Sequence, residues 1–155
     1  MTTLKAGDKA PNFKGANESG DTIALKDYKG KKLALFFYPK DDTPTCTKEA
    51  CSLRDGYKTL QKNGIEVLGV SPDKSKKHEK FIGKYELPFS LLADTEQETL
   101  KAYGVWGPKK FMGKEYVGVH RTTFLIDEKG EIEHVIEKVK SKEHADQILD
   151  LLDKA

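Results

Sequence analysis

The sequence has few cysteines and no long hydrophobic segment. Cys46 and Cys51 are the only cysteines among its 155 residues, which excludes a disulfide-rich secreted scaffold. No stretch approaches the roughly 20 consecutive apolar residues of a membrane span, and residues 1–5 carry no signal-peptide pattern. We therefore expect a cytoplasmic protein whose thiols stay reduced. A chain of this length buries about two thirds of its unfolded surface, enough to fold without a disulfide or metal staple.

An excess of charge of either sign is also absent. The 27 basic and 25 acidic residues leave a net charge of +2, and the lysines are spread along the chain. This balance gives no electrostatic footprint for nucleic acid or for an acidic membrane surface. Arginine is scarce, because only Arg54 and Arg121 accompany the lysines. An arginine provides a fixed, always-charged fork, so either residue could mark a site that needs one, although codon usage would give the same count.

Few residues suit a metal site. Zinc sites usually have four protein ligands in closely spaced pairs, and both cysteines are far in sequence from every histidine. The histidines are His78, His120, His134 and His144. We expect no metal ion and no cofactor.

The chain alternates between strand-like and helix-like segments. A turn-rich hairpin is predicted over 12–25, and the apolar run 32–38 predicts a strand buried on both faces. Further strands are predicted over 65–70, 89–92, 120–127 and 131–139, with the last two forming a hairpin. Helices are predicted over 44–63, 74–85 and 96–103 and again after 141. Residues 105–119 are rich in glycine and lysine and allow no assignment.

The helix boundaries carry recognisable capping residues. Thr43 is the expected N-cap of the first helix, with Pro44 in the first helical position, and Asn63-Gly64 is its expected left-handed end. The other expected N-caps are Asp73, Asp94 or Thr95, and Ser141. The order of elements predicts a single α/β domain over residues 1–155. A thioredoxin-like fold fits this order best, with a mixed central sheet, helices on both faces and an N-terminal β-hairpin.

Cys46 occupies the third position of the helix that Thr43 and Pro44 begin. The first N–H groups of a helix have no carbonyl partner within it, and the helix dipole is positive there. Both effects favour a thiolate and lower the pKa of a thiol. The polar segment before Cys46 makes access plausible. A free cysteine is more often a small buried hydrophobe, and this alternative stays open.

Cys51 lies five residues after Cys46. Five helical residues advance about 7.5 Å along the axis, whereas a disulfide tolerates Cα atoms up to about 7 Å apart. An intact helix therefore cannot hold a Cys46–Cys51 disulfide. If the two cysteines join, the first turns of the helix must unwind, which is the behaviour of a switch.

Several motifs resemble the peroxiredoxins. The segment Pro39-Lys40-Asp41-Asp42-Thr43-Pro44-Thr45-Cys46 is similar to the peroxiredoxin signature, and Thr47-Lys48-Glu49-Ala50-Cys51 resembles its bacterioferritin comigratory protein, or peroxiredoxin Q, group. Val105-Trp106-Gly107, Phe111-Met112-Gly113-Lys114 and the segment from His120 to Asp127 resemble the same group in order and spacing. The likeness extends from about residue 5 to about residue 152. Thr45 departs from the pattern, because many relatives have glycine there.

The resemblance implies a thiol-specific peroxidase acting on hydrogen peroxide and organic hydroperoxides. Cys46 would attack the peroxide and become a sulfenic acid, and Cys51 would resolve it as an intramolecular disulfide. Thr43 would supply a hydroxyl to the reacting oxygens, and Arg121 would hold the thiolate and the peroxide. The resemblance also implies recycling by thioredoxin, or by glutaredoxin, and a monomer.

Two further site residues follow from the resemblance. Glu49 is similar to the glutamate that orients the arginine, although a solvent-facing carboxylate at a helix start is nearly as good an interpretation. Pro39 would shield the pocket and ends its strand in either case. Trp106, Phe111 and Met112 could cover the site, but packing is the commoner role for such side chains, and His120 is interpreted as structural.

Three other functions compete with the peroxidase. A thiol–disulfide oxidoreductase normally has Cys-x-x-Cys, which this chain lacks. A redox sensor or chaperone-like module would use the same cysteine chemistry but would not turn over with a reductant. A plain binding domain would have inert thiols.

Overall fold

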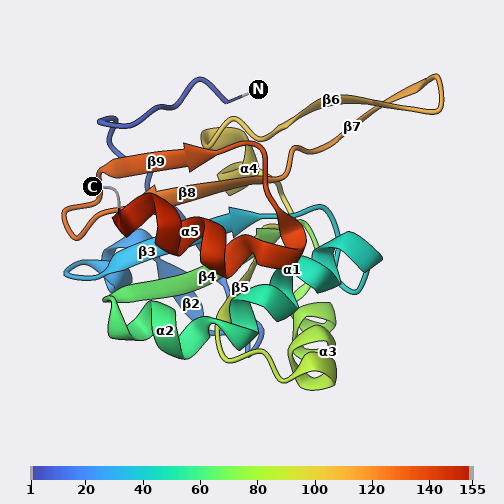
Figure 1. Ribbon diagram of the computed structural model, residues 1–155. Coiled ribbons are helices and arrows are strands. Elements are labelled where there is room, and N and C mark those ends of the chain that lie inside the picture. The colour runs from blue at the N-terminus through green and yellow to red at the C-terminus, as the bar shows by residue number, and fades with distance from the viewer. Residues whose placement is uncertain (1, 154–155) are drawn as a thin grey trace.

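The computed structural model describes residues 2–153, which form a mixed sheet with helices on both faces (Figure 1). The seven-stranded sheet has the order β2-β1-β5-β4-β3-β8-β9. Its strands are β1 (Lys14–Ala16), β2 (Thr22–Ala24), β3 (Lys32–Phe37), β4 (Ile65–Ser71), β5 (Ser90–Ala93), β8 (Thr122–Ile126) and β9 (Ile132–Ile136). Strands β3, β4 and β5 are parallel, and the remaining pairs are antiparallel. The predicted thioredoxin-like α/β fold with an N-terminal hairpin is confirmed.

Within residues 2–153, five α-helices cover the sheet. They are α1 (Pro44–Asp55), α2 (Tyr57–Lys62), α3 (Ser75–Tyr85), α4 (Glu98–Ala102) and α5 (His144–Asp153), with short 3-10 turns η1 (Leu25–Tyr28) and η2 (Ser141–Glu143). Figure 1 shows α1, α2 and α5 over one face, and α4 lies behind the sheet. No helix in the described part of the chain is long and apolar enough to cross a bilayer.

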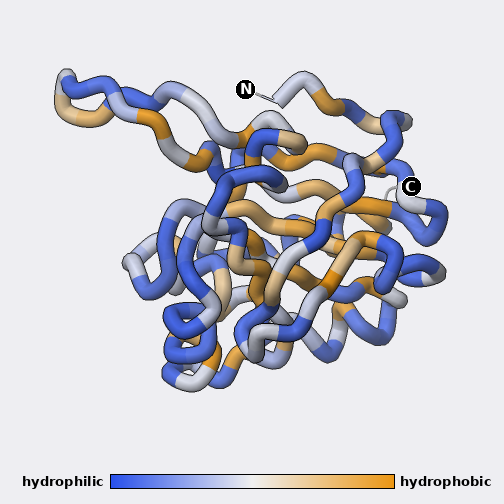
Figure 2. Tube along the Cα trace, turned by 180° about the vertical axis from the view of Figure 1, so that it is seen from behind, coloured by the Kyte–Doolittle hydropathy of each residue, from blue (hydrophilic) through white to orange (hydrophobic). Residues whose placement is uncertain are grey.

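Strand β3 is the centre of the core because it is buried on both faces. Its alternate side chains enter two different hydrophobic clusters. Ala34 and Phe36 meet α1, α2, α3 and α5 on one side, whereas Leu35 and Phe37 meet α4 on the other. Figure 2 shows the same distribution, with hydrophobic segments along the central strands and hydrophilic segments on the outer helices and loops. The carboxyl end of β3 leads directly into the segment that carries Cys46.

The predicted helix over 44–63 is divided in the structure. It breaks at Gly56, which separates α1 from α2. A methyl group at Gly56 would lie only 2.5 Å from Cβ of Ala145 on α5. The close approach of α5 therefore requires glycine here, and the sequence of the first helix alone does not reveal this constraint. The predicted left-handed end is present at Gly64, whose φ is +75°.

Three predicted N-caps differ in the structure. Lys74 rather than Asp73 is the N-cap of α3, because the Asp73 carboxylate instead accepts the backbone N–H of Asp41 at 2.7 Å. Helix α4 begins later than expected, yet Asp94 still accepts the N–H groups of its residues Thr99 and Leu100. Ser141 lies within η2 rather than at the start of α5.

The unassigned segment 105–119 forms a second, two-stranded sheet. Strands β6 (Trp106–Phe111) and β7 (Lys114–Val119) make a hairpin that extends from the body of the protein (Figures 1 and 2). Its turn residues Met112 and Gly113 both have positive φ, as tight hairpin turns require. Phe111 and Met112 are 65% and 88% exposed, so the packing role expected of them is wrong, whereas Trp106 does pack, against the hydrophobic cluster on the α4 side of the sheet.

The contact between Gly56 and α5 predicts the effect of a single added methyl group. Gly56→Ala should lower the free energy of unfolding by about 1–3 kcal/mol, because the backbone at Gly56 and helix α5 would have to move apart to make room for the methyl group. Gly83→Ala is the matched control, since Gly83 lies exposed in α3 with nothing within 4 Å of an added methyl group, and it should stabilise by about 0.5–1 kcal/mol. Urea denaturation measures both; equal midpoints for Gly56→Ala and the parent would contradict the packing described.

Candidate active site

Cys46 lies at the start of α1, just beyond the carboxyl end of β3. It is the third residue of the helix, as predicted, but its side chain is only 1% exposed. Both cysteines are free thiols, and Cys51 is half-buried in the same unbroken helix. The helical spacing of the two residues keeps their Cα atoms too far apart for a disulfide. The protein is thus arranged with Cys46 enclosed and unlinked.

Arg121 contacts the sulfur from a distant part of the chain. It precedes β8, and its Nη2 donates to Sγ of Cys46 at 3.0 Å. Its Nη1 donates to Oε1 of Glu49 at 2.5 Å. Burial alone would lower the pKa of Arg121, but the neighbouring Glu49 and Cys46 together raise it above its ordinary value. A permanently charged donor at hydrogen-bond distance favours the thiolate over the thiol.

Glu49 is completely buried beneath this arginine. Its exposed fraction is 0%, so the interpretation of Glu49 as a solvent-facing carboxylate is wrong. Burial raises the pKa of Glu49 to about 7, although Arg121 acts in the opposite direction. The carboxyl group therefore changes charge near neutral pH, and Arg121 connects it to Cys46.

The loop before Cys46 holds the other two expected site residues. Pro39 is half-buried at the end of β3. Thr43 is the N-cap residue by position, but its side chain does not cap α1; its hydroxyl donates instead to the carbonyl of Lys40 at 2.9 Å. The structure thus places Arg121 in direct contact with both Cys46 and Glu49, with Thr43 one turn earlier and Cys51 further along the helix.

A buried network that the sequence did not reveal anchors this loop to α3. Asp41 is 2% exposed; its Oδ1 accepts the hydroxyl of Tyr38, and its Oδ2 lies 2.6 Å from Nδ1 of His78. The other ring nitrogen of His78 donates to the carbonyl of Leu92 at 3.0 Å. Burial and then Asp41 raise the pKa of Tyr38 well above its ordinary value, so this phenol remains a donor.

The next residue makes a second attachment to the same helix. Asp42 has φ of +59°, and its carboxylate accepts Nζ of Lys84 at 2.8 Å and the hydroxyl of Tyr85 at 2.7 Å. Arg54 also binds α3, through the carbonyl of Tyr85. The two arginines of the sequence thus have different positions: Arg121 lies at Sγ of Cys46, and Arg54 lies in the last turn of α1. His120 binds the carbonyl of Pro108 and connects β8 to the hairpin.

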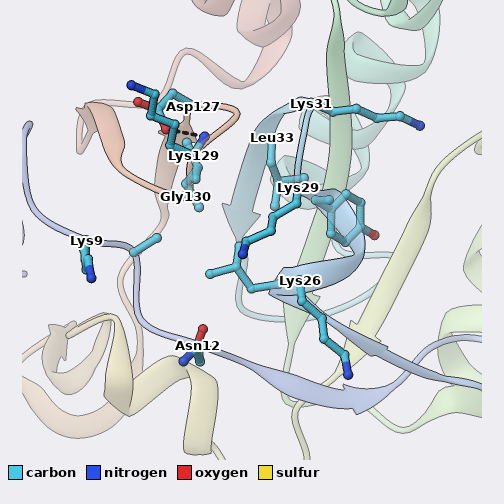
Figure 3. Close-up of a pocket in the computed structure, with 13 residues that line it drawn as sticks. Lys9, Asn12, Lys26, Lys29, Lys31, Leu33, Asp127, Lys129 and Gly130 are labelled. Atoms are coloured by element: carbon cyan, nitrogen blue, oxygen red, sulfur yellow. Dashed lines mark hydrogen bonds between the residues drawn. The ribbon is translucent and has the colours of Figure 1, made fainter.

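A separate hollow of about 310 Å³ lies at the opposite end of the sheet (Figure 3). It adjoins Leu33 at the start of β3, whereas Cys46 follows the end of that strand. Its lysines include Lys26, Lys31 and Lys9, whose side chains point in different directions in Figure 3. These ammonium groups do not converge on one ligand position, so the hollow carries no ligand assignment. No cluster of metal-binding side chains occurs within residues 2–153.

Comparisons with known proteins agree with the geometry. The AhpC/TSA family matches residues 6–135. Peroxiredoxin Bcp of Escherichia coli K12 is 46% identical over 152 residues, covering 98% of this chain and 97% of the relative. Peroxiredoxin Bcp of Bacillus subtilis is also 46% identical, over 150 residues, covering 97% and 96%. Among solved structures, Xylella fastidiosa PrxQ has a TM-score of 0.92 at 29% identity, covering 99% and 98%. Xanthomonas campestris peroxiredoxin Q has a TM-score of 0.85 at 33% identity, covering 92% and 90%.

The raised pKa of Glu49 predicts a pH-dependent stability. An exposed glutamate titrates near about 4.3, so between that value and about 7 the folded protein holds a proton that the unfolded chain has lost. The contribution of Glu49 to stability therefore falls as pH rises through this interval, by up to about 4 kcal/mol. Glu49→Gln cannot titrate, so the Tm of the parent should fall relative to that of the variant between pH 4 and pH 7.

Exposed Glu79→Gln is the matched control for the loss of one carboxylate. The other buried titratable groups are shared by parent and variant, so their contributions cancel in the difference. Parallel Tm curves for the parent and Glu49→Gln across this pH range would show that Glu49 ionises normally within the fold.

Proposed function

Because this chain belongs to the AhpC/TSA family and is a thiol peroxidase of the Bcp and peroxiredoxin Q type, we propose that Cys46 is its peroxidatic cysteine. The observation that carries the proposal is the 3.0 Å contact between Nη2 of Arg121 and Sγ of Cys46. Among residues 2–153 the guanidinium of Arg54 interacts electrostatically with Cys51, but Arg54 directs its hydrogen bonds to Asp55 and to the carbonyl of Tyr85 instead. Hydrogen peroxide and organic hydroperoxides are the proposed substrates, and the bacterioferritin comigratory protein of Xanthomonas campestris, a solved relative, has alkyl peroxide reduction activity.

The proposed first step is displacement at the peroxide O–O bond. The Cys46 thiolate attacks the terminal oxygen of ROOH, the S–O bond forms as the O–O bond breaks, and RO⁻ leaves and takes a proton from water. The products are the sulfenic acid of Cys46 and ROH. Arg121 stabilises the negative charge that moves from sulfur to oxygen, because its fork is already held by Glu49. Pro39 is assigned to shielding the pocket.

Thr43 has a specific place in this scheme. Its hydroxyl group donates its proton to the hydrogen bond with the carbonyl of Lys40. Its oxygen is therefore available to accept a hydrogen bond from the peroxide O–H. This assignment replaces the simpler expectation of a hydroxyl donor. The Asp41–His78 contact supports the role by fixing the preceding loop against α3.

Cys51 is proposed to resolve the sulfenic acid. Its thiolate attacks the sulfur of oxidised Cys46, a disulfide forms, and the oxygen leaves as water after taking a proton. Because both residues lie in α1, the first turns of that helix must unwind before the sulfurs meet. A dithiol reductant such as thioredoxin, or glutaredoxin, then exchanges with the disulfide. Both cysteines occupy one helix, so a monomer is sufficient, and the reducing cytoplasm is the proposed location.

Two cysteine variants separate the proposed roles. Cys46→Ser should abolish peroxide consumption, because serine is not a comparable nucleophile at neutral pH. Cys51→Ser should consume one peroxide per chain and then stop, since the sulfenic acid has no resolving thiol. Peroxide assays and intact mass measure both effects. Full activity in Cys46→Ser, or normal thioredoxin-driven turnover in Cys51→Ser, would contradict the assignments.

The fork of Arg121 predicts a loss that charge alone does not restore. Arg121→Lys keeps the positive charge but cannot bind Sγ of Cys46 and Oε1 of Glu49 together. The rate constant for Cys46 oxidation should fall on the order of 10–100-fold. Arg54→Lys, at the other arginine, is the matched control and should react at nearly the parental rate in stopped flow. Unchanged kinetics in Arg121→Lys would leave Arg121 as an ordinary ion-pair partner.

A further inference from the structure

The positive charge of this protein is concentrated on helix α3. The segment from its N-cap Lys74 to its last residue Tyr85 contains five lysines and one acidic residue, Glu79. The whole chain has a net charge of only +2, so the rest of the molecule is slightly acidic. A surface patch of one sign raises the local concentration of a partner with the opposite charge.

Three of these lysines form a ridge along one side of α3. Lys76, Lys80 and Lys84 follow one another at intervals of four residues, and such residues are neighbours on a helix surface. All three are exposed, whereas His78 and Phe81 bury a different side of the helix. Like charges at this spacing destabilise a helix, so the stability of α3 does not explain the lysine ridge.

The lysine ridge ends at the loop that leads to the reactive cysteine. Nζ of Lys84 donates to the carboxylate of Asp42 at 2.8 Å, and Asp42 immediately precedes Thr43, the N-cap residue of α1. The side chain of Lys84 is still 59% exposed in this contact. A molecule that binds along the ridge therefore also reaches the residues just before Cys46.

Cys51 lies on the side of α1 that faces α3. Arg54, three residues later on α1, donates from Nη1 to the carbonyl of Tyr85 at the end of α3, at 2.9 Å. The same guanidinium interacts electrostatically with Cys51. Cys51 is half-buried, whereas Cys46 is enclosed. Figure 1 shows α3 beside α1, with α2 at the other end of α1.

We propose that the lysine ridge is the docking surface for the protein dithiol that reduces the Cys46–Cys51 disulfide, and that this reductant has acidic side chains around its reactive thiols. The inference rests on the proposed resolution by Cys51. Complementary charges steer two proteins together and fix their register. A reductant bound to the ridge faces the side of α1 on which Cys51 lies.

The docked reductant acts by thiol–disulfide exchange. Its thiolate attacks one sulfur of the Cys46–Cys51 disulfide, and the other cysteine leaves as a thiolate. The second thiol of the reductant then attacks the mixed disulfide, so that the reductant is oxidised and the remaining cysteine is released. Two electrons pass to this protein, and the two protons of the reductant's thiols balance the two thiols that are restored.

The size of the lysine ridge favours a protein partner over a lipid surface. From its first to its last lysine the ridge covers eight helical steps, or about 12 Å. Lys77, beside it on α3, is already paired with Asp73 at 3.2 Å. Clusters that bind anionic lipids contain about four to eight basic residues, more than the ridge provides.

The test reverses the charge of two ridge residues in the full chain. Lys76→Glu with Lys80→Glu should lower kcat/KM for an acidic thioredoxin about tenfold at low ionic strength, because steering and register are both lost. In about 0.5 M salt the difference from the parent should become small, because the charges are screened. Lys58→Glu with Lys62→Glu is the matched control, since both lysines are exposed on α2 at the same spacing, and it should retain most of the parental value.

Two further measurements separate docking from damage to the site. Dithiothreitol is an uncharged dithiol and should reduce the disulfide of each variant at the parental rate. Stopped flow with hydrogen peroxide, without any reductant, should give the parental rate constant for Cys46. Slow oxidation of the parent in that experiment would refute the proposed role of Cys46 rather than the docking surface.

Unchanged thioredoxin kinetics in Lys76→Glu with Lys80→Glu would overturn the inference. An equal loss in the α2 control would do the same, because net charge alone would then explain it. If phosphatidylglycerol vesicles bind the parent but not the ridge variant, and the thioredoxin kinetics stay the same, the ridge belongs to a lipid surface. Failure of both thioredoxin and glutaredoxin to reduce the parent also overturns it. If the reversed variant does not fold, Lys76→Gln with Lys80→Gln replaces it, with an expected loss of about threefold.

Discussion

The guanidinium of Arg121 joins two parts of the protein that are distant in sequence. It binds Sγ of Cys46 and Oε1 of Glu49 at once, and so connects the start of β8 to the first turns of α1. Strands β3 and β8 are neighbours in the sheet, with Phe37 opposite Thr122. The end of β3 therefore delivers Cys46 to the same edge from which Arg121 projects. Without this contact the thiol would be an enclosed small hydrophobe, the alternative that a free cysteine always presents.

Burying this contact places several charges out of water, and the surrounding structure compensates them. Asp41, His78 and Tyr38 hold the preceding loop through a buried network. On the other side, α5 brings His144 against the back of Glu49. The proposed resolution by Cys51 requires the site to come apart, because the two cysteines of one intact helix cannot form a disulfide.

Much of the architecture follows from local sequence, and the exceptions share a cause. The buried run of β3, the Pro44 helix start and the position of Cys46 depend on neighbouring residues, and the structure agrees with each. The break at Gly56 depends on Ala145, almost ninety residues later, so no local pattern could indicate it. Asp73 is a plausible cap whose carboxylate is taken by the N–H of Asp41. The 106–119 hairpin was missed because its strands are largely exposed and lack the alternation of a half-buried strand.

The residues of the site also divide into those that the sequence indicated and those that only the folded structure reveals. Cys46, Arg121 and Glu49 were predicted by a resemblance, and the structure has Arg121 in contact with both of the others. His144 and His78 carried no sequence signal beyond being histidines, because the neighbour that matters for each lies on another element. That neighbour is Glu49 for His144 and Asp41 for His78. Buried polar networks of this kind are set by tertiary packing rather than by spacing along the chain.

The most direct test of the account is the reaction of the reduced protein with one equivalent of hydrogen peroxide, followed by stopped flow and then by intact mass. The account predicts oxidation much faster than that of free cysteine and a final loss of two hydrogens, corresponding to a disulfide between the two cysteines of α1. A rate no greater than that of free cysteine, with the mass unchanged on that timescale, would show that Arg121 and the helix start do not activate Cys46.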